Sequence, residues 1–336
     1  MIISRAPFRI SFFGGGTDYP VWYREHGGAV LATSINKYCY VTARYLPPFF
    51  NYRYRIRYTE REEVKEISQI KHPSVRECLN HVTPDGGVEI QHNADLPARI
   101  GLGSSSTFTV SLLHALYALK GKMVTKRQLA MEAIHLEQDI IKENVGSQDQ
   151  TSAAFGGLNK ITFGGQNQIL VEPLTLEADF LDFFQSHLML FFTGFNRTAS
   201  DIAEEQIRNT PKRRSELERM LAMVDQAIAI LNSGIRNLDD FGRLLGESWM
   251  LKRHLTDRIT NHDIDDIYET ATKAGALGGK LLGAGGGGCI LFFVRPEEQA
   301  KVRDALSRFS RLLPIPFKFE NLGSQIIYYA PQSDFY

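Results

Sequence analysis

The chain has 336 residues, 43% of them apolar and 23% charged, an ordinary globular composition long enough for two domains. Its 38 Lys and Arg balance its 38 Asp and Glu, which argues against a nucleic-acid partner that needs a broad basic face. The longest strongly apolar run (289–294) is too short to cross a membrane, and three scattered cysteines indicate reduced thiols, so we expect a cytoplasmic protein without a membrane partner.

Strands dominate the beginning of the chain. The segment MIISRAPFRISFF carries Arg5 and Arg9 inside its apolar stretch, which is unlike a secretory signal. Aromatic and β-branched content predicts strands over 30–45, 52–58, 88–92, 158–162 and 169–171. In the segment 52–58, arginine alternates with aromatic or aliphatic residues. This pattern favours an edge strand, or a hairpin near an anionic ligand, over a nucleic-acid surface.

Two helices interrupt these strands. Helical periodicity begins at Thr107, directly after a glycine-rich turn, and returns over 126–142 with Thr125 as the N-cap. The segment 144–157 is polar and bounded by glycines, which predicts a loop.

Buried strands and long amphipathic helices alternate from about residue 179 onward. The strands are expected over 187–193, 289–294, 314–320 and 324–329, and the helices over 199–209, 212–233, 238–255, 264–282 and 296–311. This order predicts an α+β fold with helices on one face of an antiparallel sheet. We expect two domains, covering 1–178 and 179–336.

Three glycine clusters stand at the ends of predicted elements, over 14–16, 101–103 and 283–288. One such cluster is weak evidence, because turns use glycine for positive φ angles. Three in one chain suggest a common cause, and close approach of the backbone to a bulky anion is such a cause. The third cluster fits the letters GxGxxG, but a dinucleotide site needs a strand before the glycines and a helix after them, whereas here a helix is expected before and a strand after.

The second cluster, in the segment GLGSSST (101–107), has the context of a phosphate site. A helix N-terminus leaves backbone N–H groups unpaired and carries partial positive charge, and glycines let the backbone wrap a phosphate. The simpler alternative is a serine that only caps the helix, which needs no GLG. These letters favour phosphate binding.

Glu137 falls within the apolar stripe of the helix 126–142, and no Lys or Arg of that helix lies one turn away from it. A carboxylate facing a core needs a partner. That partner is either a distant Arg or a Mg²⁺ ion held together with a serine hydroxyl and nucleotide phosphates. Asp149, in the predicted loop, could by itself be only a turn residue.

Together these motifs resemble the superfamily of galactokinase, homoserine kinase, mevalonate kinase and phosphomevalonate kinase, the GHMP kinases. The resemblance rests on four segments: RAPFRISFFGGGTDYP, LPARIGLGSSST, GSQDQTSAAFGG and KLLGAGGGGCILFF. The segments GGGTDYPVWYREHGGAVL and TGFNRTASDIA resemble the heptose phosphate kinases among the bacterial members. Three glycines stand where galactokinases carry Gly-Glu-His, which speaks against a galactose site.

The resemblance implies an N-terminal domain like ribosomal protein S5 domain 2, a ferredoxin-like C-terminal domain, and ATP and a sugar or sugar phosphate bound between them. It implies an ATP-dependent sugar kinase with Mg²⁺ as cofactor, a monomer or homodimer. Other acceptors (galactose, fucose or an amino sugar) are alternatives on the same fold, and an inactive sugar-binding sensor is the alternative of another class.

The resemblance also implies residue roles. Asp149 would take the proton from the attacking hydroxyl, and Arg9 would orient Asp149. Ser105 and Glu137 would hold Mg²⁺. The ATP phosphates would contact Gly101, Leu102, Gly103, Ser104, Ser105, Ser106 and Thr107. The second substrate would contact Gly15, Gly16, Thr17, Asp18, Tyr19, Gly285 and Gly286, with Arg197 as a clamp for a phosphate that it already carries.

Overall fold

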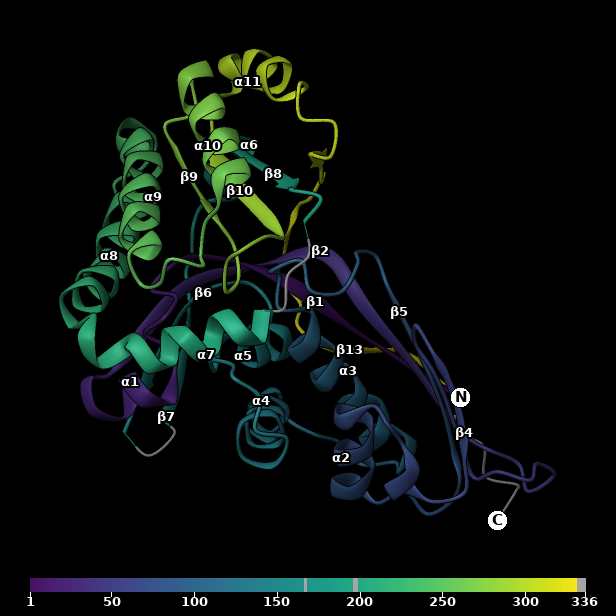
Figure 1. Ribbon diagram of the computed structural model, residues 1–336. Helices are drawn as coiled ribbons and strands as arrows, with labels where there is room; N and C mark the ends of the chain where they lie inside the picture. The colour runs from purple at the N-terminus through teal and green to yellow at the C-terminus, as the bar shows by residue number, and fades with distance from the viewer. Residues whose placement is uncertain (166–167, 196–198, 331–336) are drawn as a thin grey trace.

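The computed structural model describes residues 1–165, 168–195 and 199–330, and two sheets organise them (Figure 1). The larger sheet has the strand order β13-β1-β2-β5-β3-β4, with β6, β7 and β12 attached beside this path. Its strands are β1 (Ile2–Phe13), β2 (Gly28–Tyr45), β3 (Tyr54–Arg57), β4 (Arg61–Val64), β5 (Val88–Ala94), β6 (Leu158–Gly164), β7 (Gln168–Pro173), β12 (Phe319–Glu320) and β13 (Gln325–Tyr329). The smaller sheet has the order β11-β8-β10-β9, from Leu313–Pro314, Leu188–Phe192, Cys289–Phe293 and Gly278–Leu281.

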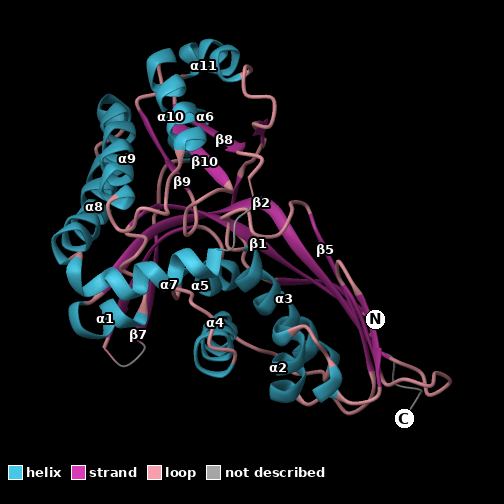
Figure 2. Ribbon diagram, in the orientation of Figure 1, coloured by secondary structure: helices cyan, strands magenta, loops and turns pink. Residues whose placement is uncertain are grey.

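Helices cover both sheets (Figure 2). They are α1 (Pro20–His26), α2 (Pro73–Val82), α3 (Ser104–Leu119), α4 (Lys126–His135), α5 (Gln148–Phe155), α6 (Ala178–Ser186), α7 (Ala199–Asn209), α8 (Arg214–Asn232), α9 (Leu238–Arg253), α10 (His262–Ala274) and α11 (Gln299–Leu306). Helix α3 packs on β1 and β2, and α2, α4 and α5 lie with it below the long strands in Figure 1. Helix α9 packs on β9 and β10. The smaller sheet lies above the long strands in Figure 1, on the side opposite to α2, α3, α4 and α5.

The predicted α+β class is confirmed. All pairings between the described strands are antiparallel except that of β3 with β5. Arg55 in β3 pairs with Glu63 and Glu89, so this strand does not present an unpaired basic face. None of the described helices combines the length and hydropathy needed to cross a bilayer.

The loop predicted over 144–157 is wrong, because residues 148–155 form α5. This helix packs against α3 and α4, and most of its residues are buried. Several of its buried residues are polar and have hydrogen-bond partners, as Gln150 has in Glu137 and Thr151 in Ser147, so its sequence resembles a polar loop. Gly156, with φ of 70°, ends the helix in a conformation that glycine tolerates.

The helix predicted over 264–282 is also too long. Helix α10 ends at Ala274 before Gly275, whose φ is 124°, and the chain then forms β9. A Cβ on Gly278 would lie 2.0 Å from the carbonyl oxygen of Gly242, so glycine is needed for the close packing of β9 on α9. The third glycine cluster therefore connects two strands. This order also lacks the helix that a dinucleotide fingerprint requires.

The C-terminal strands return to the N-terminal sheet, since β13 pairs with β1 and β12 pairs with β2. The division into 1–178 and 179–336 stays a prediction. Along the chain, the smaller sheet and the helices α7–α11 therefore come after β1–β7 and before β12 and β13, which all belong to the larger sheet.

Candidate active site

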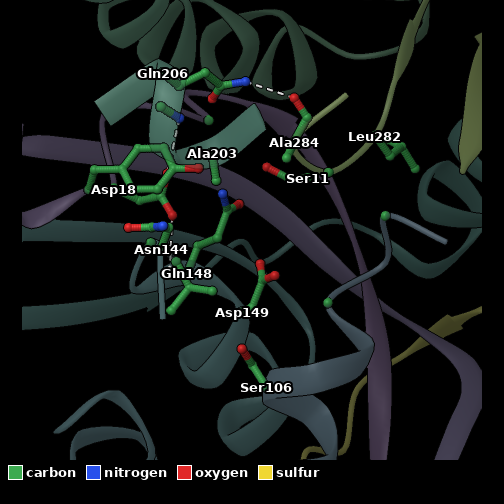
Figure 3. Close-up of a pocket in the computed structure, with 18 of the residues that line it drawn as sticks. Ser11, Asp18, Ser106, Asn144, Gln148, Asp149, Ala203, Gln206, Leu282 and Ala284 are labelled. Atoms are coloured by element: carbon green, nitrogen blue, oxygen red, sulfur yellow. Dashed lines mark hydrogen bonds between the residues drawn. The ribbon is translucent and has the colours of Figure 1, made fainter. Parts of the chain in front are cut away.

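Residues of the three glycine clusters line one cavity of about 350 Å³. Figure 3 shows part of its lining, including Asp18, Ser106 and Asp149. Gly15 and Gly16 line it from the turn after β1, Gly101 and Gly103 from the turn before α3, and Gly283 from the turn after β9. The last two turns touch, because a Cβ on Gly283 would lie 2.5 Å from the Cα of Gly101. Residues of all three clusters therefore line one cavity; the common anionic ligand expected from the sequence stays a prediction.

Arg9 and Asp149 form a paired group at this cavity. The Arg9 Nε donates to Asp149 Oδ1 at 2.9 Å and its Nη2 donates to Oδ2 at 3.1 Å. Its Nη1 donates to the carbonyl oxygen of Gly101 at 2.7 Å. Arg9 is buried within β1, so its fork holds the carboxylate in one orientation and ties it to the glycine turn. Arg9 and Asp149 are thus in direct contact, as the resemblance implied.

The glycine turn GLGSSST leads directly into α3. Gly103 is the N-cap with φ of 79°, and Ser104, Ser105 and Ser106 form the first turn, three residues earlier than predicted. All three serines line the cavity. Leu102 does not line it, because its side chain is buried in the core, and Thr107 turns its hydroxyl back to the carbonyl oxygen of Gly103 at 2.8 Å.

Glu137 lies in a π turn (Leu136–Ile140) that continues α4. Its Oε2 accepts hydrogen bonds from Ser106 Oγ at 2.7 Å and from Gln150 Nε2 at 2.5 Å. Its Oε1 has no partner in the part of the chain that the structure describes. Burial raises the pKa of Glu137 to about 7, and hydrogen bonds from neighbouring side chains oppose the rise.

The serine that bonds to Glu137 is Ser106, whereas Ser105, expected to hold Mg²⁺ together with Glu137, lines the cavity beside it; its role as a Mg²⁺ ligand stays a prediction. Successive residues of a helix are rotated by about 100°, so Ser105 is exposed at the cavity while Ser106 points inward to Glu137. An ion pair of Glu137 with a distant Arg does not occur among the described residues. A hydroxyl oxygen next to an unpaired carboxylate oxygen suits a hard cation such as Mg²⁺, provided that phosphate oxygens or water complete the coordination.

Asp18, which follows the first glycine cluster along the chain, lines the cavity at the end opposite to Ser106 (Figure 3). Its Oδ1 accepts from the Gly16 N–H at 3.0 Å, and its Oδ2 accepts from the Gln148 N–H at 3.4 Å. Burial, together with the charge of Asp149, raises the pKa of Asp18. Tyr19 also lines the cavity, whereas Thr17 lies beneath the turn and donates to the carbonyl oxygens of Gly14 and Ala29.

Two expected contacts of the third cluster are absent from the cavity. Gly286 donates its N–H to the carbonyl oxygen of Ile259, and a Cβ on Gly285 would meet the backbone of the same residue, so both face away. Gly283 and Ala284 line the cavity in their place. Arg197 lies outside the described residues.

Comparison with known proteins decides the family. A model of the GHMP kinase N-terminal domain matches residues 70–157, and a model of the GHMP kinase C-terminal domain matches residues 226–311, about half of the chain together. The chain belongs to the GHMP kinases. It is 28% identical over 319 residues to D-glycero-alpha-D-manno-heptose 7-phosphate kinase of Campylobacter jejuni, covering 91% of this chain and 93% of that one.

Solved structures agree with this assignment. The structure of a D-glycero-D-manno-heptose 1-phosphate kinase from Bacteroides thetaiotaomicron matches with a TM-score of 0.77 and 25% identity over 98% of this chain and 99% of that one. A galactokinase of Lactococcus lactis, at 20% identity, shares the fold with a TM-score of 0.71 over 96% of this chain and 94% of the other. The two-domain α+β fold of the GHMP kinases is therefore shown, and the chain is an ATP-dependent phosphotransferase.

Sequence reasoning missed two lysines of this GHMP kinase. Lys252, from the end of α9, and Lys280, from β9, both line the cavity and are buried. Lys280 could have been found, because it begins the segment KLLGAGGGG. Lys252 gives no signal, because a lysine near a helix C-terminus is typical of any solvent-facing helix end.

Proposed function

We propose that this GHMP kinase transfers the γ-phosphoryl group of ATP to the anomeric hydroxyl of D-glycero-D-manno-heptose 7-phosphate. The product would be the 1,7-bisphosphate, a precursor for cell-surface polysaccharide. The observation that carries a kinase active site is the Arg9–Asp149 pair, held at 2.9 Å and 3.1 Å against the glycine turn of α3. The choice of heptose phosphate is supported by the similarity to the Campylobacter jejuni enzyme along 91% of the chain.

Asp149 is proposed to accept the proton of the hydroxyl that attacks the γ-phosphorus, or to align that hydroxyl. Phosphoryl transfer depends mainly on positioning and on neutralisation of charge. Two hydrogen bonds from Arg9 hold the carboxylate in one place, so the hydroxyl meets a pre-oriented acceptor. The remaining bond of Arg9, to Gly101, couples this acceptor to the turn proposed for the phosphates.

The first turn of α3 is proposed to bind the ATP phosphates through the backbone from Gly103 to Ser106 and the three serine hydroxyls. The N–H groups of this turn have no helical partner, and the helix adds partial positive charge at the same end. Ser106 and Glu137 would hold Mg²⁺, which when bound would neutralise phosphate charge. The unpaired Oε1 of Glu137 is the feature of this chain that supports a cation there.

Asp18 is proposed to bind sugar hydroxyls. Both of its oxygens are fixed by backbone N–H groups, so it presents an oriented acceptor beside Gly15, Gly16 and Tyr19. Arg197 remains the candidate from the sequence for the phosphate on the sugar.

The test is a coupled ATPase assay with free sugars and with sugar 1-, 6- and 7-phosphates. We expect turnover of heptose 7-phosphate to exceed that of galactose, fucose and amino sugars, and NMR should place the new phosphate on the anomeric oxygen. Preferred turnover of another sugar would refute the heptose assignment and leave the kinase. Calorimetry that detects sugar but no ATP·Mg²⁺ would instead support the inactive sensor.

A further inference from the structure

Two buried lysines at the cavity have no part in the scheme above. Lys280 Nζ donates to the carbonyl oxygen of Phe12 at 2.7 Å. Lys252 Nζ donates to the carbonyl oxygens of Leu281 at 2.9 Å and Gly283 at 2.5 Å. Neither lysine forms an ion pair with a carboxylate in the described part of the chain.

An ammonium group carries three N–H donors, so these bonds leave two donors on Lys280 and one on Lys252 without a protein acceptor among the described residues. Both side chains are almost fully buried, with exposed fractions of 7% for Lys252 and 2% for Lys280. A buried cation without a counter-charge is costly, and the cost falls when an anion enters beside it. Both lysines therefore bring unused N–H donors and a positive charge without a carboxylate partner to the same cavity.

The position of Lys280 favours the sugar side of this cavity, because it bonds to Phe12 at the end of β1, shortly before the first glycine cluster and Asp18. The charges that act on both lysines are Arg9, whose carboxylate partner is Asp149, and Asp18. Asp18 is the proposed sugar acceptor, and the first turn of α3 is the proposed site for ATP. A phosphate on a sugar bound at Asp18 would thus share the cavity with both lysines.

We propose that Lys252 and Lys280 bind the phosphate group that the sugar substrate already carries. This inference rests on the proposed sugar kinase activity and adds a specificity determinant to it. Phosphate oxygens accept hydrogen bonds from ammonium groups, and two adjacent lysines would select a dianion over a neutral hydroxymethyl group. The site would explain how a chain with zero net charge distinguishes a sugar phosphate from a free sugar.

A purely structural role is the rival explanation. Lys280 joins β9 to β1, and Lys252 holds the turn after β9. A structural lysine would affect both substrates of the kinase and every sugar alike, whereas a phosphate ligand would change the preference between a phosphorylated sugar and its free form. The preference is therefore the quantity to measure.

The experiment compares kcat/KM for heptose 7-phosphate and for unphosphorylated heptose in the wild type, Lys252→Met and Lys280→Met, with KM for ATP measured in parallel. We expect the ratio of the two kcat/KM values to fall by about 10- to 100-fold in each variant, the worth of one or two charged hydrogen bonds. Lys280→Gln keeps a donor for Phe12 without the charge, and it should show the same loss if Lys280→Met does not fold.

Lys120→Met is the matched control. Lys120 also donates to two carbonyl oxygens, those of Val82 and Thr83, but it lies away from the cavity, so the ratio should not change. An unchanged ratio in the Lys252 and Lys280 variants, or a rise confined to KM for ATP, would overturn the inference. If the wild type ignores heptose 7-phosphate but prefers another sugar phosphate, the proposed substrate fails, and the same ratio for that sugar still tests the lysines. If it accepts only free sugars, the inference fails as well.

Discussion

Gly146 offers a way to move the Asp18 carboxylate without touching its chemistry. A Cβ on Gly146 would lie 1.9 Å from Asp18 Oδ2 and 2.6 Å from its Cγ. Ordinary contact begins at 3.4 Å, so in Gly146→Ala the carboxylate must move by about 1.5 Å. The φ of Gly146 does not lie in the left-handed region, so alanine adds this clash without backbone strain.

The displacement predicts a large effect on the sugar and a small one on ATP. A shift of that size breaks the bonds from the Gly16 and Gln148 N–H groups that now orient Asp18 at 3.0 Å and 3.4 Å. Misplacement of a positioning group by about 1 Å can cost about 100-fold. We therefore expect kcat/KM for the sugar to fall by about 100-fold, while KM for ATP stays near the wild-type value.

The assay is steady-state kinetics with each substrate varied in turn. Gly164→Ala, at the end of β6, is the matched control, because its Cβ would meet no atom within 4 Å. Thermal unfolding verifies that both variants are folded. A double-mutant cycle then tests the route: in an Asp18→Ala background, Gly146→Ala should cost little more. Full additivity of the two changes, or wild-type kinetics in Gly146→Ala, would refute the reasoning.

Four further predictions follow from the site and its supports. Asp149→Asn should lower kcat by about 100-fold or more with little change in ATP binding by calorimetry, since a positioned proton acceptor is lost; unchanged turnover would remove Asp149 from the reaction. Glu137→Gln should raise the Mg²⁺ concentration needed for half-maximal activity by about 10-fold or more without loss of thermal stability, because an ionisable group leaves a buried position; an unchanged Mg²⁺ titration would exclude the proposed ligand. Burial lowers the pKa of Lys280 to about 7. A bound phosphate would raise that pKa, so calorimetry in two buffers should show proton uptake near pH 7.5. The affinity for the sugar phosphate should be greatest between about pH 6, where the phosphate becomes a dianion, and about pH 7, and should decline above pH 7; an affinity that rises above pH 7 contradicts the assignment. Thr125, whose hydroxyl accepts from the Gln128 N–H at 3.1 Å, caps α4, so Thr125→Ala should lower the free energy of unfolding in urea by about 1 kcal/mol, and no loss would mean that the cap is dispensable.

The sequence predicted most of the strands and their order correctly, because they carry strong local patterns. The segment 30–45, rich in β-branched and aromatic residues, became β2, and the segment 88–92 became the start of β5. The N-cap at Thr125 was likewise a local feature that the structure confirms. Helix α5 had no such pattern, because several of its buried residues are polar.

The candidate site shows the same division. Its glycine clusters could be named in advance from residue type and spacing, and Arg9 and Asp149 from the resemblance to the GHMP kinases. The contact of Glu137 with Ser106 could not, because it depends on the residue at which α3 begins, and a shift of one position rotates every side chain by about 100°.

The sequence by itself indicated the family and most of the elements, since these follow from residue type and near-neighbour spacing. Only the tertiary structure decided which residues face one another. Packing of β9 against β1 and α9 brought Lys252 and Lys280 to the cavity and turned Gly285 and Gly286 away from it. Burial and pairing are properties of contacts between distant segments, and no local pattern along the chain records them.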